Sequence, residues 1–536
     1  MSGSGPIVAD TGCAFTSPHF LATQAGMEVL ERGGNAIDAM VSAAAMIAVA
    51  YPHMNGLGGD SFWIVHQPGS EPWAIDASGV AASAASPDWY HERGLQNIPS
   101  RGPAATLTMA GTVAGWQLAR ETFAAKNPRE KLSPLEKLLV PAVDRANHGI
   151  EVTESLAAAA AKVSPELREF EPFQRIFTRS GMQLRAGDVF ANTKMGALLA
   201  ELGSEGLDGF YRGTVGQKIA AALQDSGSPL TPGDFAAYRA KVVKPLVANI
   251  RHGRVFNLPA PTQGFASLLL LAIYDRLAQE DWQEADNIHA IIECTKRAFQ
   301  LREQWVADPD QVPVDLQAEL SDEAVMKVAA QVDLDSVSDW PHFAAGGDTV
   351  WMAARDGKGT LVSFIQSLYW EFGSGVVVPE YGLVWNNRGS SFTLTPGLRQ
   401  VGGGRKPFHT LNPALFLDHE GSSRIAFGTM GGEGQPQTQA AMIMRHLYLG
   451  NSLASSVANP RWLLGRTWGD VDHGLKVEAD LGADIIWALK KRGHDIKTVP
   501  AKSEIMGHAG MVKDDVRHGV TAAADPRSDG LALSAG

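Results

Sequence analysis

Thr349 is the residue of this chain whose surroundings point to nucleophilic chemistry. It follows Gly346-Gly347-Asp348 and opens an apolar run, which resumes after a polar turn as a second apolar stretch ending at Leu368. This pattern predicts a β-hairpin with Thr349 at the start of its first strand. Taken alone, a threonine there is more often a good strand former than a nucleophile. Two glycine-rich stretches, residues 55–60 and 428–437, favour the chemical interpretation.

Glycine-rich and turn motifs recur in a defined order along the chain. They are Gly33–Ala39, Asn55–Asp60, Gly111–Gly115, Phe372–Gly375, Asn386-Asn387, Gly428–Gln437 and Asp525–Gly530. Their order and spacing, from about Ala22 to Gly530, resemble the γ-glutamyltranspeptidase family of N-terminal-nucleophile hydrolases. The resemblance implies an α/β (α+β) fold, a four-layer αββα sandwich that a large and a small subunit form jointly as one intertwined catalytic unit.

The resemblance implies that Thr349 attacks amide carbonyls once it has become an N-terminal residue. A threonine hydroxyl is a poor nucleophile near neutral pH and needs a base close by. The α-amine of an N-terminal threonine, with a pKa of roughly 7.7–8.0, can supply that base. Because this amine exists only after the Asp348–Thr349 bond is cut, we expect self-cleavage into residues 1–348 and 349–536. No metal and no organic cofactor is expected.

Three further residues acquire catalytic roles from the resemblance. The backbone N–H groups of Gly431 and Gly432 match the pair that stabilises the oxyanion, since glycine permits the close backbone approach that such a site needs. Without the resemblance, the two glycines are as consistent with a tight turn after a strand as with an oxyanion site. Ser367 matches a family threonine whose hydroxyl bonds the nucleophile's amine, and a serine keeps that hydrogen-bonding capacity.

The residues that should bind the acyl group depart from the family, which grips a γ-glutamyl group by its α-carboxylate and α-amine. The substitutions are Ser78 for an arginine, Tyr369 for an asparagine, Ser391 for an aspartate just past Asn386-Asn387, and His409-Thr410 for two serines. A charge-assisted hydrogen bond is worth about 1.5–3 kcal/mol. Losing both charged partners therefore predicts weak binding of γ-glutamyl substrates.

Three cationic residues could bind a carboxylate in another geometry: Arg388, His409 and Arg101. We favour Arg388, whose guanidinium stays charged and binds carboxylate through two bonds, over His409, which is charged only part of the time near neutrality. Each is otherwise a surface or structural residue. Tyr369 and Trp370 either wall off a small acyl pocket or pack in the core. The candidate substrate contacts are Arg388, His409, Thr410, Tyr369, Asn387 and Ser391.

These departures resemble the amidase and acylase branch of the family, which includes oxamate amidohydrolase and glutaryl-cephalosporin acylases. We therefore predict hydrolysis of a small carboxylate-bearing amide such as oxamate. One alternative is a γ-glutamyltransferase or glutathione hydrolase that binds the γ-glutamyl group through a different set of residues. Another is a glutaryl-cephalosporin-type acylase. A third, a catalytically silent binding relative, is disfavoured because Thr349, Ser367, Gly431 and Gly432 keep usable chemistry.

Composition limits the partners and the location of the protein. The 536 residues are 45% hydrophobic and 19% charged, typical of a soluble globular protein. The net charge of −12 argues against a nucleic-acid partner. Residues 1–6 lack the basic and apolar regions of a signal peptide, and Ala39–Tyr51 is too short to span a bilayer. We therefore expect a cytoplasmic protein without a membrane partner, as a heterodimer or a dimer of heterodimers.

Cysteine and histidine spacing gives no sign of a disulfide framework or a zinc site. Cys13 and Cys294 are the only cysteines, and they are far apart in the sequence. The histidines are scattered through the chain, without the paired spacing that binds zinc.

The elements that must position these residues are read from periodicity, which by itself supports a mixed α/β fold. Predicted helices are Thr23–Glu31, a helix capped by Asn35 and ending near Ala50, Pro134–His148, Leu156–Lys162, Gly213–Asp225, Asn287–Arg302, Gln437–Leu449 and Ala479–Arg492. Predicted strands are Phe62–His66, Trp73–Asp76, strands within Val242–Leu258, Val350–Ala354, Leu361–Leu368, Leu383–Trp385, Pro413–Leu417 and Arg424–Gly428. Ala307–Gly347 reads as a mobile, solvated connection before the cut.

Overall fold

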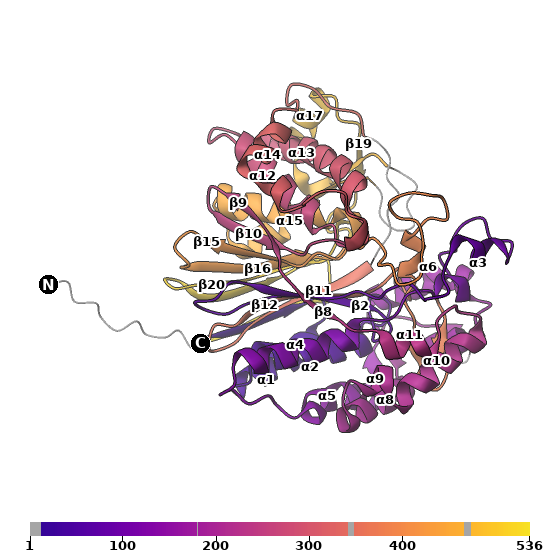
Figure 1. Cartoon of the computed structure of the whole chain (residues 1–536). Coiled ribbons are helices and arrows are strands. Elements are labelled where there is room, and N and C mark those ends of the chain that lie inside the picture. The colour runs from indigo at the N-terminus through magenta and orange to yellow at the C-terminus, as the bar shows by residue number, and fades with distance from the viewer. Residues whose placement is uncertain (1–11, 180, 341–347, 466–472) are drawn as a thin grey trace.

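Two antiparallel sheets stack face to face between two layers of helices (Figure 1). The computed structural model describes residues 12–179, 181–340, 348–465 and 473–536, with the side chain of Asp348 left out. The arrangement confirms the predicted four-layer sandwich.

The first sheet has seven strands in the order β22-β1-β11-β12-β2-β3-β8. Their bounds are β22 Leu531–Ala535, β1 Cys13–Ser17, β11 Asp348–Arg355, β12 Leu361–Tyr369, β2 Asp60–His66, β3 Trp73–Ala77 and β8 Lys241–Val243. The neighbouring strands β11 and β12 form the predicted hairpin, and β11 begins one residue before Thr349.

The second sheet has six strands in the order β21-β20-β16-β15-β10-β9. Their bounds are β21 Gly519–Ala524, β20 Ala509–Asp515, β16 Ser423–Thr429, β15 Ala414–Asp418, β10 Gly253–Asn257 and β9 Leu246–Ile250. Residues before and after Thr349 contribute strands to both sheets, so the two halves of the chain are interleaved.

Smaller ladders lie outside the two main sheets. They pair β4 Ile150–Glu151 with β7 Val189–Phe190, β5 Thr178–Arg179 with β6 Met182–Gln183, and β13 Val377–Val378 with β14 Leu383–Val384. A fourth small sheet joins β17 Trp462–Leu464, β18 Leu475–Glu478 and β19 Ile496–Val499.

The first helical layer covers the outer face of the first sheet (Figure 1). Its members are α1 Phe20–Glu31, α2 Ala36–Ala50, α4 Thr112–Lys126, α5 Leu135–His148 and α8 Thr193–Glu205, with α3 Pro87–His91, α6 Glu154–Leu167, α7 Glu171–Phe177, α9 Gly209–Arg212, α10 Thr214–Ser226 and α11 Pro232–Ala237 beside them. The Asn35 side chain accepts from the Asp38 N–H and caps α2, as predicted. Every residue of α2 is buried, which confirms the apolar stretch as a core helix.

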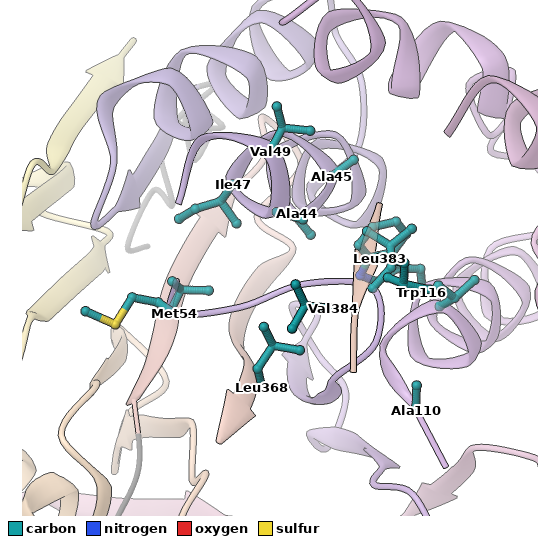
Figure 2. Close-up of a cluster of buried hydrophobic side chains, with 14 of the residues drawn as sticks. Ala44, Ala45, Ile47, Val49, Met54, Ala110, Trp116, Leu368, Leu383 and Val384 are labelled. Carbon is teal, nitrogen blue, oxygen red and sulfur yellow. The ribbon is translucent and has the colours of Figure 1, made fainter. Parts of the chain in front are cut away.

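Figure 2 shows how α2 packs against the end of β12. Leu368 of β12 and Val384 of β14 lie beneath Ala44 and Val49 of α2, in the core of the first helical layer. Leu368 sits between Ser367 and Tyr369, so its burial holds the end of β12 in place.

The second helical layer covers the outer face of the second sheet (Figure 1). It contains α12 Gly264–Leu277, α13 Glu284–Trp305, α14 Asp322–Ala329, α15 Gln435–Ile443, α16 Leu453–Ala458 and α17 Ala483–Lys491. One turn of π-helix, Met444–Tyr448, continues α15, so the helix predicted over Gln437–Leu449 changes its winding midway. None of the helices in the described ranges is long and apolar enough to cross a membrane.

Part of the segment predicted as a structureless connection is helical. Within Ala307–Gly347, α14 is capped by the Ser321 side chain and buries Val325 and Val328 against α12 and its neighbours. The acidic and polar residues around this short helix hid its apolar spacing in the sequence. Residues 341–347, the last part of the segment that was expected to be mobile, lie outside the described residues.

The core between the two sheets is built around Trp351. This indole packs against the bare backbone of Gly428 in β16 and of Gly510 in β20, and its Nε1 donates to Ser363 Oγ at 3.0 Å. Alternate residues of β11, such as Ala353, face the same core. Glycine at residue 428 therefore lets the sheets approach closely.

Gly428→Ala should destabilise the protein by about 1–3 kcal/mol, because its new methyl group would overlap the Trp351 ring. Thermal unfolding would show a lower midpoint. The matched control is Gly209→Ala in α9, where an added Cβ meets nothing within 4 Å and the change should be neutral or slightly stabilising. Equal midpoints for both variants would mean that the sheets separate at little cost.

Candidate active site

Strand register brings Thr349, Ser367 and Asp60 to one end of the first sheet. Ser367 pairs with Asp60 across β12 and β2, and Val350 pairs with Gln366 across β11 and β12. The register between β11 and β12 shifts between Asp348 and Val350, so Thr349 lies at an irregular point of the ladder. Such irregularities commonly re-aim a side chain beside a functional site.

Packing between the sheets determines which turn of the second sheet faces Thr349. At one end, the side chains of Arg355 in β11 and Arg424 in β16 both bind Asp514. Towards the other end, Trp351 packs against Gly428. The two strands therefore run in opposite directions across the interface.

Arg355 lies opposite Arg424, and Trp351 lies opposite Gly428. Continuing two residues further along both strands places Thr349 at the level of the turn after β16, Met430–Gly432. Thr349 is only 1% exposed, and its Oγ1 has no hydrogen-bond partner among the described residues. Gly431 and Gly432 have φ angles of 116° and 54°, which glycine adopts at little cost. Their N–H groups donate to no described residue, and α15 starts shortly afterwards. Unused N–H groups near a helix start suit a negatively charged oxygen.

Ser367 fixes the backbone beside the nucleophile candidate. Its Oγ accepts a 2.7 Å hydrogen bond from the Tyr369 N–H. Tyr369 has a φ of 85°, a conformation that is strained for a bulky residue. This hydrogen bond helps to hold a turn that aims the Tyr369 ring at Arg388.

Arg388 is a buried cation at the centre of the candidate acyl site. It is 1% exposed, its guanidinium carbon lies 3.8 Å from the centre of the Tyr369 ring, and Nη1 donates to Thr410 Oγ1 at 3.3 Å. Its Nε and Nη2 have no partner among the described residues. Burial lowers the pKa of Arg388 to about 10, so the group stays charged at neutral pH. The geometry leaves N–H donors for an anion.

His409 is neutral rather than partly charged. Its Nε2 lies 2.9 Å from Asp60 Oδ2, and burial, followed by the nearby Arg388 charge, holds the His409 pKa well below its usual range. Burial also raises the pKa of Asp60 to about 7, although Arg388 and the Gly79 N–H favour its ionised form. The sequence singled out His409 but used Asp60 only as part of a glycine-rich motif.

Asn387, Ser391 and Arg101 are engaged in holding loops together. Asn387 accepts from the Trp370 N–H at 3.1 Å and donates to Ser100 O at 2.8 Å. The Ser391 hydroxyl lies within hydrogen-bond distance of two carbonyls, Arg388 O at 3.0 Å and Phe408 O at 3.1 Å. Arg101 binds the Glu166 carboxylate and the backbone carbonyls of residues 371 and 373. These contacts tie all three side chains to other parts of the protein.

Ser78 is also bound internally, where the family arginine would stand. Its hydroxyl donates to Asp76 Oδ1 at 2.5 Å, and Asp76 Oδ2 pairs with Lys406 Nζ at 2.5 Å. Burial opposes ionisation of Asp76, but Lys406 and Ser78 outweigh it and keep the Asp76 pKa below its ordinary value. Sequence reasoning missed Lys406, whose only signal was its position three residues before His409.

One group of potential metal ligands occurs in the described part of the chain: His289, Glu293 and His494, in the second helical layer. Their ligand atoms lie within 4.8 Å of one another. His289 Nδ1 is 2.8 Å from His494 Nε2, and Lys296 Nζ is 2.7 Å from Glu293 Oε1. Because the ammonium already balances the carboxylate, these side chains form a satisfied polar network without a metal.

Known proteins share this sequence and fold over nearly their whole length. The sequence model of the family described as Gamma-glutamyltranspeptidase matches residues 22–535. The oxamate amidohydrolase proenzyme of Klebsiella pneumoniae is 45% identical over 520 residues, which are 96% of this chain and 97% of the relative. The glutathione hydrolase-like YwrD proenzyme of Bacillus subtilis is 35% identical over 522 residues, 96% of this chain and 97% of the relative.

A solved structure extends the comparison to the fold. The cephalosporin acylase of Bacillus halodurans superposes with a TM-score of 0.88 and 29% sequence identity, covering 99% of this chain and 97% of that chain.

Asp60→Asn should change how stability depends on pH. Because the Asp60 pKa is raised in the folded protein to about 7, from about 3.9 when unfolded, its protonated form stabilises the fold most below about pH 4. That contribution is lost as the pH rises to about 7. The stability of wild type relative to Asp60→Asn should therefore fall from pH 4 to 7, measured by thermal unfolding of chains in the same processing state. A difference that stays constant would show that Asp60 titrates normally.

Proposed function

This chain belongs to the γ-glutamyltranspeptidase family, and from that premise we propose that it is a self-processing amidohydrolase with Thr349 as its nucleophile. Its substrate is a small amide that carries a carboxylate, with oxamate as the first candidate. The 45% identical relative is named an oxamate amidohydrolase proenzyme, and the buried Arg388 offers a site for a carboxylate. Arg388 is the observation that carries the substrate proposal.

The first reaction is the cut that creates the active N-terminus. Thr349 Oγ1 attacks the Asp348 carbonyl carbon, the Asp348–Thr349 C–N bond breaks, and the proton lost by the hydroxyl ends on the new α-amine. Water then hydrolyses the resulting ester, which frees the Asp348 carboxyl and restores the hydroxyl. The products are residues 1–348 and 349–536, a heterodimer whose strands are interleaved in both sheets.

The second reaction uses the new amine as the base. It takes the Thr349 hydroxyl proton while Oγ1 attacks the substrate amide carbonyl, and the N–H groups of Gly431 and Gly432 stabilise the oxyanion. The proton passes to the leaving nitrogen, which departs as ammonia and leaves an acyl ester on Thr349. Water, deprotonated by the same amine, releases the acid and regenerates the enzyme.

Arg388 would hold the substrate's carboxylate through its unused N–H groups. Desolvation of a cation is costly, and a carboxylate bound through two charge-assisted hydrogen bonds offsets that cost. Thr410 steadies one edge of the guanidinium, and the Tyr369 ring covers its face. A short, planar acid such as oxamate suits an enclosed site of this kind.

A γ-glutamyl substrate would lack a partner for its ammonium group. The Ser391 hydroxyl lies within hydrogen-bond distance of two backbone carbonyls, and Ser78 is hydrogen-bonded to Asp76, so neither replaces the family's charged contacts. The ammonium would also lie in the same site as the Arg388 cation. We therefore rank glutathione hydrolysis below amide hydrolysis, and cytoplasmic location stays a prediction.

Processing can be tested by N-terminal sequencing of the small fragment, which should begin at Thr349. Thr349→Ala should remain a single chain because it has no hydroxyl to attack the preceding carbonyl, whereas Thr349→Ser should still be cut. A fragment that starts at another residue would refute the nucleophile assignment, as would normal cutting of the alanine variant.

Arg388→Met should raise KM for oxamate by about 100-fold or more, from the loss of two charge-assisted bonds. Hydrolysis of oxamide, a neutral amide of similar size, should change far less. Steady-state ammonia release measures both, with processing at Thr349 as the check that the variant folds. Equal losses on the two amides would make Arg388 structural. Efficient hydrolysis of glutathione by the wild type would favour the γ-glutamyl alternative.

A further inference from the structure

Gln263 connects the two turns that face the substrate. This residue lies just before α12 and is fully buried. Its Nε2 donates to Thr410 O at 2.7 Å and to Gly432 O at 2.8 Å. Its Oε1 accepts from Arg302 Nη1 at 2.9 Å. Both amide hydrogens and the amide oxygen are therefore used.

Arg302 fixes the orientation of the Gln263 amide. A guanidinium has only donors, so the group that faces Arg302 must be the amide oxygen, and the NH₂ must face the two carbonyls. Arg302 is itself fully buried in α13 and held by Glu303 at 2.7 Å and Glu433 at 3.2 Å. Glu433 directly follows Gly432, so this ion pair restrains the same turn a second time.

The two carbonyls belong to opposite ends of the proposed substrate site. Thr410 accepts from Arg388, which would bind the substrate's carboxylate, and Gly432 belongs to the turn that would bind the oxyanion. We propose that Gln263 is a positioning residue that sets the spacing between these two turns and so selects amides of short dicarboxylic acids. This inference rests on the function proposed above.

The physical argument is one of preorganisation. The two hydrogen bonds that Gln263 Nε2 donates are buried and end on backbone carbonyls, so losing the NH₂ leaves two unsatisfied acceptors. It also removes the side-chain link between the two turns, while the bond from the Gln263 N–H to His409 O at 2.9 Å remains. Each methylene between carboxylate and amide moves the acid farther from the scissile carbonyl. A fixed spacing between the two turns therefore fits substrates of one carbon-chain length. A variable spacing accepts several lengths but binds each of them less well.

The link that Gln263 makes between the two turns can be tested without any substrate. In Gln263→Met, backbone amides of residues 408–411 and 430–434 should exchange hydrogen for deuterium faster than in the wild type. The control is Gln437→Met, which removes another buried glutamine that bonds the backbone of Leu464 at 2.9 Å and 2.8 Å. Gln263→Glu keeps the side-chain shape and the Arg302 contact but loses the donors, so it should behave like Gln263→Met. Unchanged exchange at both turns in both Gln263 variants would overturn the inference.

Its effect on selectivity needs a series of amides: oxamate, malonamate and succinamate. In both Gln263 variants, kcat/KM for the best member should fall about 30-fold, and the preference for it over the next member should shrink about tenfold. Gln437→Met should keep the wild-type preference. A uniform loss that leaves the preference intact would refute the spacing role. If the processed wild type hydrolyses none of the three amides, the proposed function fails. The hydrogen-exchange experiment still decides whether Gln263 holds the two turns together.

Discussion

The contact of the Trp351 indole with the bare backbone of Gly428 is the constraint on which the candidate site depends. Trp351 belongs to β11 of one sheet, and Gly428 belongs to β16, the strand of the other sheet that leads into the turn with Gly431 and Gly432. A side chain at Gly428 would push the sheets apart and carry that turn away from Thr349. The geometry of the candidate site is therefore set by core packing two or three residues away from Thr349 and Gly431, rather than by the loops themselves.

Electrostatics within the candidate site follow from the burial of its charged and titratable groups. Arg388, Asp60 and His409 are all buried, and each has a pKa shifted mainly by burial. Proteins keep such groups out of solvent chiefly where function needs them, because apolar residues would stabilise a core better. Arg388 keeps its charge while the neighbouring His409 is neutral, so of these two residues Arg388 is the one that offers a positive charge to an anion.

Sequence patterns predicted elements well where one local signal dominated. Asn35 before an apolar run marked the start of α2, and the Gly-Gly-Asp-Thr sequence before another apolar run marked β11. Helix α14 was missed because two buried valines carry little weight in an acidic stretch.

Pairings between distant residues had no local signal at all. The contacts of Lys406 with Asp76, and of Gln263 with Thr410 and Gly432, join residues far apart in the chain. Periodicity cannot reveal such contacts. The pair Arg388 and Thr410 was named from family positions, and only the fold brought the guanidinium to the hydroxyl.

The interleaving of strands from both sides of Thr349 has a thermodynamic consequence. A cut before Thr349 changes unfolding from a unimolecular event into the separation of two chains, since neither fragment holds a complete sheet. The free energy of unfolding would then depend on protein concentration. Dilution and heat would act together, and recovery of the fold would become a second-order reaction between fragments. A mature enzyme of this design is long-lived only while its barrier to separation is high, so its lifetime is a kinetic property.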